Sequence, residues 1–111
     1  MSRRALLWVG SARKHVRAFP PRARRRAGHL LDLLQQGLQP TDSKPMPTVG
    51  SGVYELRIRA EAAFRVFYVA KFAEGIYVLH GFEKKTQQTV RLDIEASSKC
   101  YRRLVKERRS D

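Results

Sequence analysis

Apolar positions follow a helical spacing in three parts of the chain. Between Pro21 and residue 36 they recur at intervals of three and four residues, which predicts an amphipathic helix that ends before Gly37. A shorter helix is predicted over residues 11–19, because Ser11 is a suitable N-cap and Pro20 disfavours a helical residue before it. From about residue 89 to residue 109 apolar residues again share one helical face.

Four other segments have the composition of strands. Residues 5–10 form a short apolar run, and residues 53–60, 63–72 and 75–82 are rich in β-branched and aromatic residues. The last three lie two residues apart, which predicts an antiparallel meander, whereas the proline- and glycine-rich stretch 38–52 is a predicted loop. The expected fold is α+β: a small antiparallel β-sheet packed on one face by an N-terminal helical hairpin and a C-terminal helix, in a single domain spanning residues 1–111. The other face of the sheet is then open.

The alternation of side chains along the predicted strands places charged residues on this open face. In the segment 53–60, Leu56 and Ile58 point to the core, so Arg57 and Arg59 point away from it. Burying an arginine or a histidine under helices without a partner would cost several kcal/mol, so the charged residues of the next two strands belong on the same face. The residues expected on this face or at its rim are Arg57, Arg59, Arg65, His80, Phe82, Lys84 and Lys85.

The run YVLHGFEKK, residues 77–85, ends an apolar strand with a histidine and two lysines. Strict alternation turns Tyr77 and Leu79 toward the helices, and it places His80 and Phe82 on the open face together with Val78. We therefore expect the imidazole of His80 beside the arginines of the neighbouring strands.

The net charge of the chain favours one chemical class of binding partner. The chain carries +13, and the excess lies at its two ends: residues 1–27 hold nine Lys or Arg and no acid, whereas residues 28–98 are balanced. Such a field favours a polyanionic partner, with nucleic acid ahead of an acidic protein, and a merely solvated surface is the alternative. The single cysteine excludes an internal disulfide and a cysteine-based metal cage, and no apolar run approaches the roughly 20 residues of a membrane span. We expect no membrane association and a reducing, cytoplasmic setting.

Several stretches resemble the phage-derived branch of the RelE/HigB-like toxins of type II toxin–antitoxin pairs. They are WVGS, RAFP, LLQQG, GVYELRIR, FRVFYVAKF and YVLHGFEKKTQQT, followed by a helix that contains DIE. The resemblance covers almost the whole chain and implies a curved antiparallel sheet. It also implies a ribosome-dependent mRNA endonuclease that needs no metal or organic cofactor. A cognate antitoxin, usually of helix-turn-helix type, would neutralise the toxin, and operator DNA would be bound only through the toxin–antitoxin complex. Gly81 stands where alanine is common in this branch, and Val90 where proline often opens the last helix.

The resemblance assigns chemistry to the expected face. Metal-free RNA cleavage needs a base for the ribose 2′-hydroxyl, cations for the phosphate and an acid for the leaving oxygen. Arg57 and Arg65, with Arg59, suit the phosphate, and His80 suits the acid or the base. Lys84 or Lys85 would add a charge or serve as the acid, and Phe82 would stack on a base. Each has a structural alternative: ion pairs of the arginines with Glu55 and Glu83, a structural histidine, packing of Phe82, and solvated lysines.

Basic residues outside this face are too dispersed for one active site. We expect Arg24, Arg25 and Arg26 of the long N-terminal helix, and Arg102, Arg103 and Lys106 of the tail, to grip ribosomal RNA. Two other functions stay open. The first is a ParE-like inhibitor of DNA gyrase, and the second is a non-catalytic nucleic-acid-binding protein derived from a decayed toxin.

Overall fold

A computed structural model describes residues 3–109, apart from the side chain of Thr89. The elements in chain order are β1 (Leu6–Trp8), α1 (Ala12–Arg17), α2 (Pro21–Gln35), β2 (Ser43–Pro45), β3 (Val53–Arg59), β4 (Ala63–Val69), β5 (Ile76–Glu83) and α3 (Gln87–Arg109). The predicted α+β class is confirmed, and each predicted helix and strand is present with shifted ends. The short strand β2 is an addition, because it lies inside the stretch that was predicted to be a loop.

The strands form one open sheet in the order β1-β5-β4-β3-β2. The pairs β2–β3, β3–β4 and β4–β5 are antiparallel, as predicted for the meander, but β1 runs parallel to β5, with Leu6 opposite Ile76. The prediction of a wholly antiparallel sheet is therefore wrong at this edge. The direction of β1 depends on a partner 70 residues further along the chain (76 − 6), which local sequence does not reveal. At the other edge Pro45 closes β2, where a residue without an N–H is tolerated.

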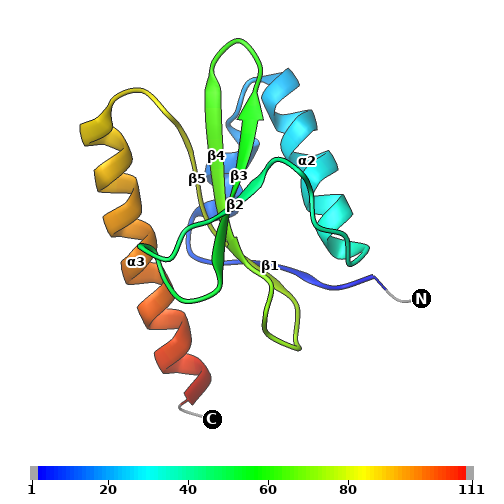
Figure 1. The fold of residues 1–111 in the computed structure, drawn as a ribbon, viewed down its shortest axis with the longest axis vertical. Coiled ribbons are helices and arrows are strands. Elements are labelled where there is room, and N and C mark those ends of the chain that lie inside the picture. Colours follow the sequence, from blue (N-terminus) through cyan, green and yellow to red (C-terminus); the bar gives the residue numbers. More distant parts are fainter. Residues whose placement is uncertain (1–2, 110–111) are drawn as a thin grey trace.

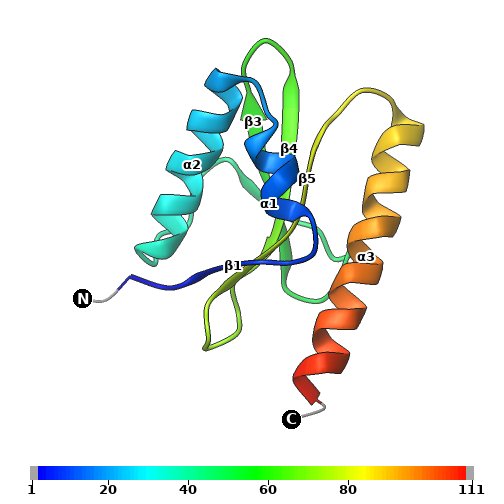
Figure 2. The same cartoon turned by 180° about the vertical axis from the view of Figure 1, so that it is seen from behind.

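The first face of the sheet is covered by α1 and α2. The helices contribute small and aliphatic residues such as Ala23, Ala27 and Leu30, which pack against Leu56 and Val66 from the strands. Figure 2 shows α1 lying across β4 and β5 on this side, with α2 beside it. This half of the core is the one that the helical spacing predicted.

The second face is covered by α3, and it is not open as predicted. Figure 1 shows α2 and α3 on opposite sides of the strands. Leu104, Ile94 and Tyr101 of α3 pack against Phe67 and Leu79 of the sheet. The physical reason is that β4 and β5 are apolar on both faces, so each face needs an apolar layer. Placing the C-terminal helix beside the N-terminal hairpin was therefore wrong.

A β-bulge in β5 changes the predicted side-chain directions. Phe67 lies opposite His80, but the next residue, Tyr68, lies opposite Val78, so Leu79 is an extra residue on β5. Ile76 and Val78 therefore join the core under α1 and α2, whereas Leu79 and Tyr77 pack under α3. Strict alternation assigned these four residues to the wrong faces. Its placement of His80 on the same face as Phe82 is confirmed, since the two rings stack with centroids 5.6 Å apart.

Candidate functional site

Four arginines line a pocket of about 420 Å³ at the β3 side of the second face. Its lining consists of Arg57 and Arg59 from β3, Arg65 from β4, Arg26 from α2, and Asp42 from the α2–β2 loop. We call this the arginine pocket. The backbone carbonyl of Asp42 accepts a hydrogen bond from the N–H of Arg57 at 2.8 Å, and its carboxylate pairs with Arg26 at 2.7 Å. The volume lies within the range of small-ligand sites, and the lining is strongly cationic.

A buried carboxylate orders the floor of the arginine pocket. Glu55, with 8% of its side chain exposed, accepts a hydrogen bond from Nε of Arg57 at 2.8 Å. Its other oxygen lies 3.7 Å from Nε of Arg65, whose side chain is 11% exposed. Glu55 therefore holds two guanidinium groups side by side at the pocket, and Nη1 of Arg65 also donates a hydrogen bond to the backbone carbonyl of Phe64 at 3.3 Å.

Among these arginines, Arg65 is the one whose charged form is most disfavoured by its surroundings. Burial lowers the pKa of its guanidinium, and the charges of Arg57 and Arg59 lower the pKa further, whereas Glu55 raises it. A cation that is desolvated and surrounded by like charges gains from any additional anion brought to it. An oxyanion in the arginine pocket would supply that charge.

A second polar cluster lies on the same face under the first half of α3. Nε2 of His80 lies 2.6 Å from Oδ1 of Asp93, and both side chains are mostly buried. The ring of His15 on α1 meets the ring of His80 edge-on, with centroids 5.4 Å apart. Phe82 lies between His80 and Phe67, stacking on the first and packing against the second at 5.2 Å. We call His80 and Asp93 the histidine–aspartate pair.

The predicted residues thus fall into three groups. Arg57, Arg59 and Arg65 come together as expected, and Arg26 joins them, although it was assigned to a separate RNA-gripping surface. His80 and Phe82 share their face but lie under α3, with Phe82 buried to 8% exposure. Lys84 and Lys85 are exposed just after β5, and the described lining of the arginine pocket does not include them. Arg24 and Arg25 are exposed on α2.

Three polar partners escaped the sequence reasoning: Asp42, Asp93 and His15. Alternation along a strand cannot find them, because they lie on helices and a loop that reach the sheet from either side. The carboxylate of Glu55 was considered only as an ion-pair partner of the arginines, and the structure confirms that pairing. A sequence signal for Asp93 does exist, since it is an acid among the first turns of a helix whose neighbours Val90 and Ile94 are apolar.

No group of three or more His, Cys, Asp or Glu in residues 3–109 is arranged to hold a metal ion. None of the helices in this part of the chain is long and apolar enough to cross a membrane.

A family model described as "Phage derived protein Gp49-like (DUF891)" matches residues 14–102. The chain belongs to this family. The Gp49-like family is part of the RelE/ParE-like toxin superfamily, in agreement with the resemblance noted above. The match spans α1 to most of α3 and so includes the arginine pocket and the histidine–aspartate pair. No curated protein and no solved structure matches the chain.

Proposed function

We propose that this Gp49-like protein is the toxin of a type II toxin–antitoxin pair and acts as a HigB-like, ribosome-dependent endonuclease of mRNA. One observation carries the proposal. Guanidinium groups from two strands and one helix converge on a single pocket, on the sheet face that also holds an imidazole. Forked guanidinium donors match phosphate oxygens, and an imidazole exchanges protons near neutral pH.

The register of the sheet supports a shared substrate for the two clusters. Arg65 lies opposite Phe82, and Phe67 lies opposite His80, so Arg65 and His80 are diagonal neighbours on adjacent strands. Such neighbours are about 7–8 Å apart, which two side chains can span across one phosphate group. Arg57 and Arg65 would neutralise the charge on phosphorus as the ribose 2′-oxygen attacks, with His80 and one of Lys84 or Lys85 as the proton carriers. The products would be a 2′,3′-cyclic phosphate or 3′-phosphate and a 5′-hydroxyl.

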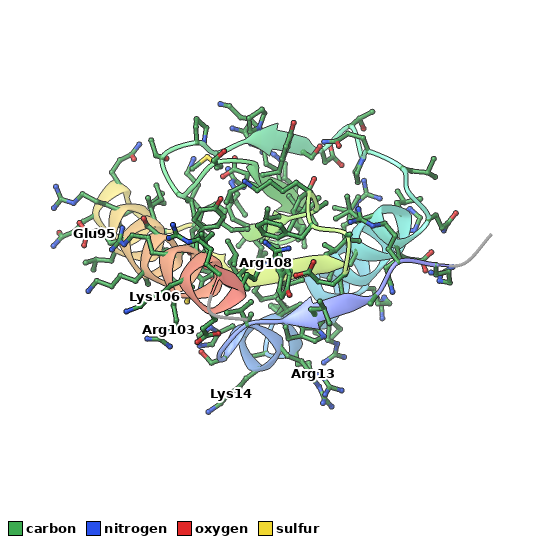
Figure 3. The ribbon with its side chains drawn as sticks, turned by 90° about the horizontal axis from the view of Figure 1, so that it is seen from below. Arg13, Lys14, Glu95, Arg103, Lys106 and Arg108 are labelled. Carbon is green, nitrogen blue, oxygen red and sulfur yellow. The ribbon has the colours of Figure 1, made fainter. Side chains whose placement is uncertain are left out.

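The exposed basic residues supply a docking surface for ribosomal RNA in this proposal. Arg24 and Arg25 are exposed on α2, the helix that also contributes Arg26 to the arginine pocket. Figure 3 shows Arg103 and Lys106 on the outer side of α3, at the far side of the molecule. Phosphate contacts of this kind position a protein without reading sequence. The cognate partner would be an antitoxin of helix-turn-helix type, and operator DNA would be bound through the complex of the two.

The test is cleavage of a defined message on purified translating ribosomes, with the 5′ ends of the fragments mapped. We expect cuts with 5′-hydroxyl ends, and a rate about 10²-fold lower for Arg57→Ala and for Arg65→Ala. Arg13→Ala is the matched control, because it removes one exposed arginine from α1 at the other edge of the molecule (Figure 3). Intact messages together with inhibited DNA supercoiling by gyrase would overturn the proposal in favour of a ParE-like inhibitor. Intact messages and unaffected gyrase would favour a non-catalytic binding protein.

Ribosome binding is tested separately from cleavage. Replacing Arg24 and Arg25 with alanine should weaken binding to ribosomes at physiological salt and lower the salt dependence of the affinity. The unfolding transition should not move, because both side chains are exposed. An unchanged ribosome affinity would remove α2 from the proposed docking surface.

A further inference from the structure

His80 is restrained by side chains from three different elements. Asp93 on α3 contacts Nε2 at 2.6 Å, Phe82 on β5 stacks against one face of the ring, and His15 on α1 meets the ring edge-on. The side chains of His80 and Asp93 are only 15% and 18% exposed, so few water molecules reach the contact between them. The ring therefore has one orientation, with Nε2 directed at the carboxylate.

The chemistry of the carboxylate decides which nitrogen carries the proton. An ionised carboxylate accepts hydrogen bonds and donates none. A contact of 2.6 Å to Asp93 therefore places a proton on Nε2 of His80, which donates it to Oδ1. A neutral imidazole holds only one proton, so Nδ1 keeps its lone pair.

We infer that Asp93 is a positioning residue, which commits His80 to the Nε2–H tautomer and leaves Nδ1 to act as a proton acceptor. The catalytic meaning of this inference rests on the proposed ribonuclease function. Nδ1 would take the proton of the ribose 2′-hydroxyl while the 2′-oxygen forms its bond to phosphorus. The bond from phosphorus to the 5′-oxygen breaks in the same displacement, and that oxygen receives its proton from a lysine ammonium or from water. Asp93 would stabilise the imidazolium that forms.

The inference makes the packing of α3 part of the site. Asp93 lies on the turn next to Ile94, which packs into the second core layer. The hydroxyl of Ser97, a fully buried residue, donates a hydrogen bond to the backbone carbonyl of Asp93 at 2.7 Å. The position of the carboxylate is therefore fixed by the packing of the helix, and α3 affects catalysis through Asp93, a residue that does not itself touch the message.

The first experiment reads the tautomer directly and needs no activity. The full-length protein, labelled with ¹⁵N at histidine, is examined by long-range ¹H–¹⁵N correlation near neutral pH. We expect a protonated Nε2 and an unprotonated Nδ1 at His80, and a mixture of tautomers in Asp93→Asn, because an amide either accepts from or donates to the ring. Glu95→Gln is the matched control, since it removes one negative charge from the same helix at a site that Figure 3 shows on its outer side. A predominant Nδ1–H tautomer in the wild-type protein would overturn the inference even if Asp93→Asn does not fold.

The second experiment measures cleavage by the same variants. Asp93→Asn should lower the rate by about 10²-fold, whereas Glu95→Gln should keep the wild-type rate. In a His80→Gln background, Asp93→Asn should have no further effect, because Asp93 acts only through His80. An equal further loss in that background would contradict a positioning role. If the wild-type protein shows the expected tautomer but cleaves no message, the proposed function is overturned. The pairing of His80 with Asp93 still holds in that case.

Discussion

The two faces of the sheet are built from the same strands, yet they differ in what they bury. The face under α1 and α2 is covered by aliphatic and aromatic side chains from two helices and four strands. The face under α3 buries apolar residues as well, but it also buries Glu55 and Arg65 and half-buries the histidine–aspartate pair. Along β3, β4 and β5, the side chains on the first face stabilise the fold through apolar packing. The side chains on the second face include the charged residues of the candidate site.

The comparison teaches that the two faces should respond differently to substitution. On the first face, loss of stability should follow the volume removed, since its buried side chains are almost all apolar. On the second face, loss should follow which partner of a charge pair is removed, because the remaining charge stays buried. Four experiments test this difference.

The largest effect is expected from a truncation on the first face. Leu30 on α2 is 2% exposed, so Leu30→Ala should lower the free energy of unfolding by about 3–5 kcal/mol. Leu92 on α3 is 58% exposed, and Leu92→Ala should change the free energy of unfolding by less than about 0.5 kcal/mol. Urea denaturation of both variants measures the contrast. Similar values for the two would mean that the first face is not the main source of stability.

The next effect is expected from the buried carboxylate of the second face. Glu55→Gln removes no volume but leaves Arg65 without its counter-charge, and it should lower the free energy of unfolding by about 3 kcal/mol. Glu61→Gln is the control, because Glu61 makes an exposed ion pair with Arg22 that is worth at most about 1 kcal/mol. If Glu55→Gln unfolds like the control, the ordering of the arginines does not depend on Glu55.

A smaller effect is expected where β5 passes closest to α1. A Cβ atom on Gly81 would lie 2.7 Å from Cγ2 of Val16, so Gly81→Ala should lower the free energy of unfolding by about 1 kcal/mol. The penalty should disappear in a Val16→Ala background, where the space is vacated, and a double-mutant cycle measures this coupling. A penalty that persists without the valine would locate the strain elsewhere.

The smallest effect is expected at the exposed end of α3 and depends on pH. Arg108 donates two hydrogen bonds to the carboxylate of Glu74, and these bonds, with one from Tyr77, lower the pKa of Glu74 from 4.5 to about 2. Because this pKa is depressed in the folded state, its contribution to stability is present above pH 4.5 and is lost as the pH falls toward 2. The protection factors of the amides in the last turns of α3, which compare exchange with that of the unfolded chain at the same pH, should therefore fall over that interval in the wild type. In Glu74→Gln they should be low already at neutral pH, and protection factors independent of both changes would contradict the contact.

The helices and four of the five strands were predictable because their signals are local. Spacing of apolar residues identified α2 and α3, and alternation identified the arginine face of β3. The parallel partner of β1, the strand β2 and the side on which α3 packs were not predictable, since each depends on residues far away in the sequence. The bulge at Leu79 was not predictable either, because only the pairing of β5 with β4 reveals an extra residue.

The residues of the candidate site also fall into those that local sequence identified and those that it did not. Arg57 and Arg59 were found because they lie on a strand whose opposite side is plainly apolar, and Arg65 was found because burying an unpaired arginine is costly. Arg26 and Asp42 were missed as members of the pocket, because α2 and its following loop reach around the sheet edge. The partner of His80 was missed because the second face was predicted to be open, whereas it is covered by α3, the helix that carries Asp93.

The parallel pairing of β1 with β5 has a consequence for the order in which the parts of the site are completed during synthesis. The first strand waits for a partner near residue 76, and α3 follows that partner in the sequence. During synthesis the arginines of β3 and β4 emerge well before the helix that carries Asp93. A nascent chain therefore displays the charges of the arginine pocket before His80 has its partner, and the candidate site stays incomplete until the last helix is in place.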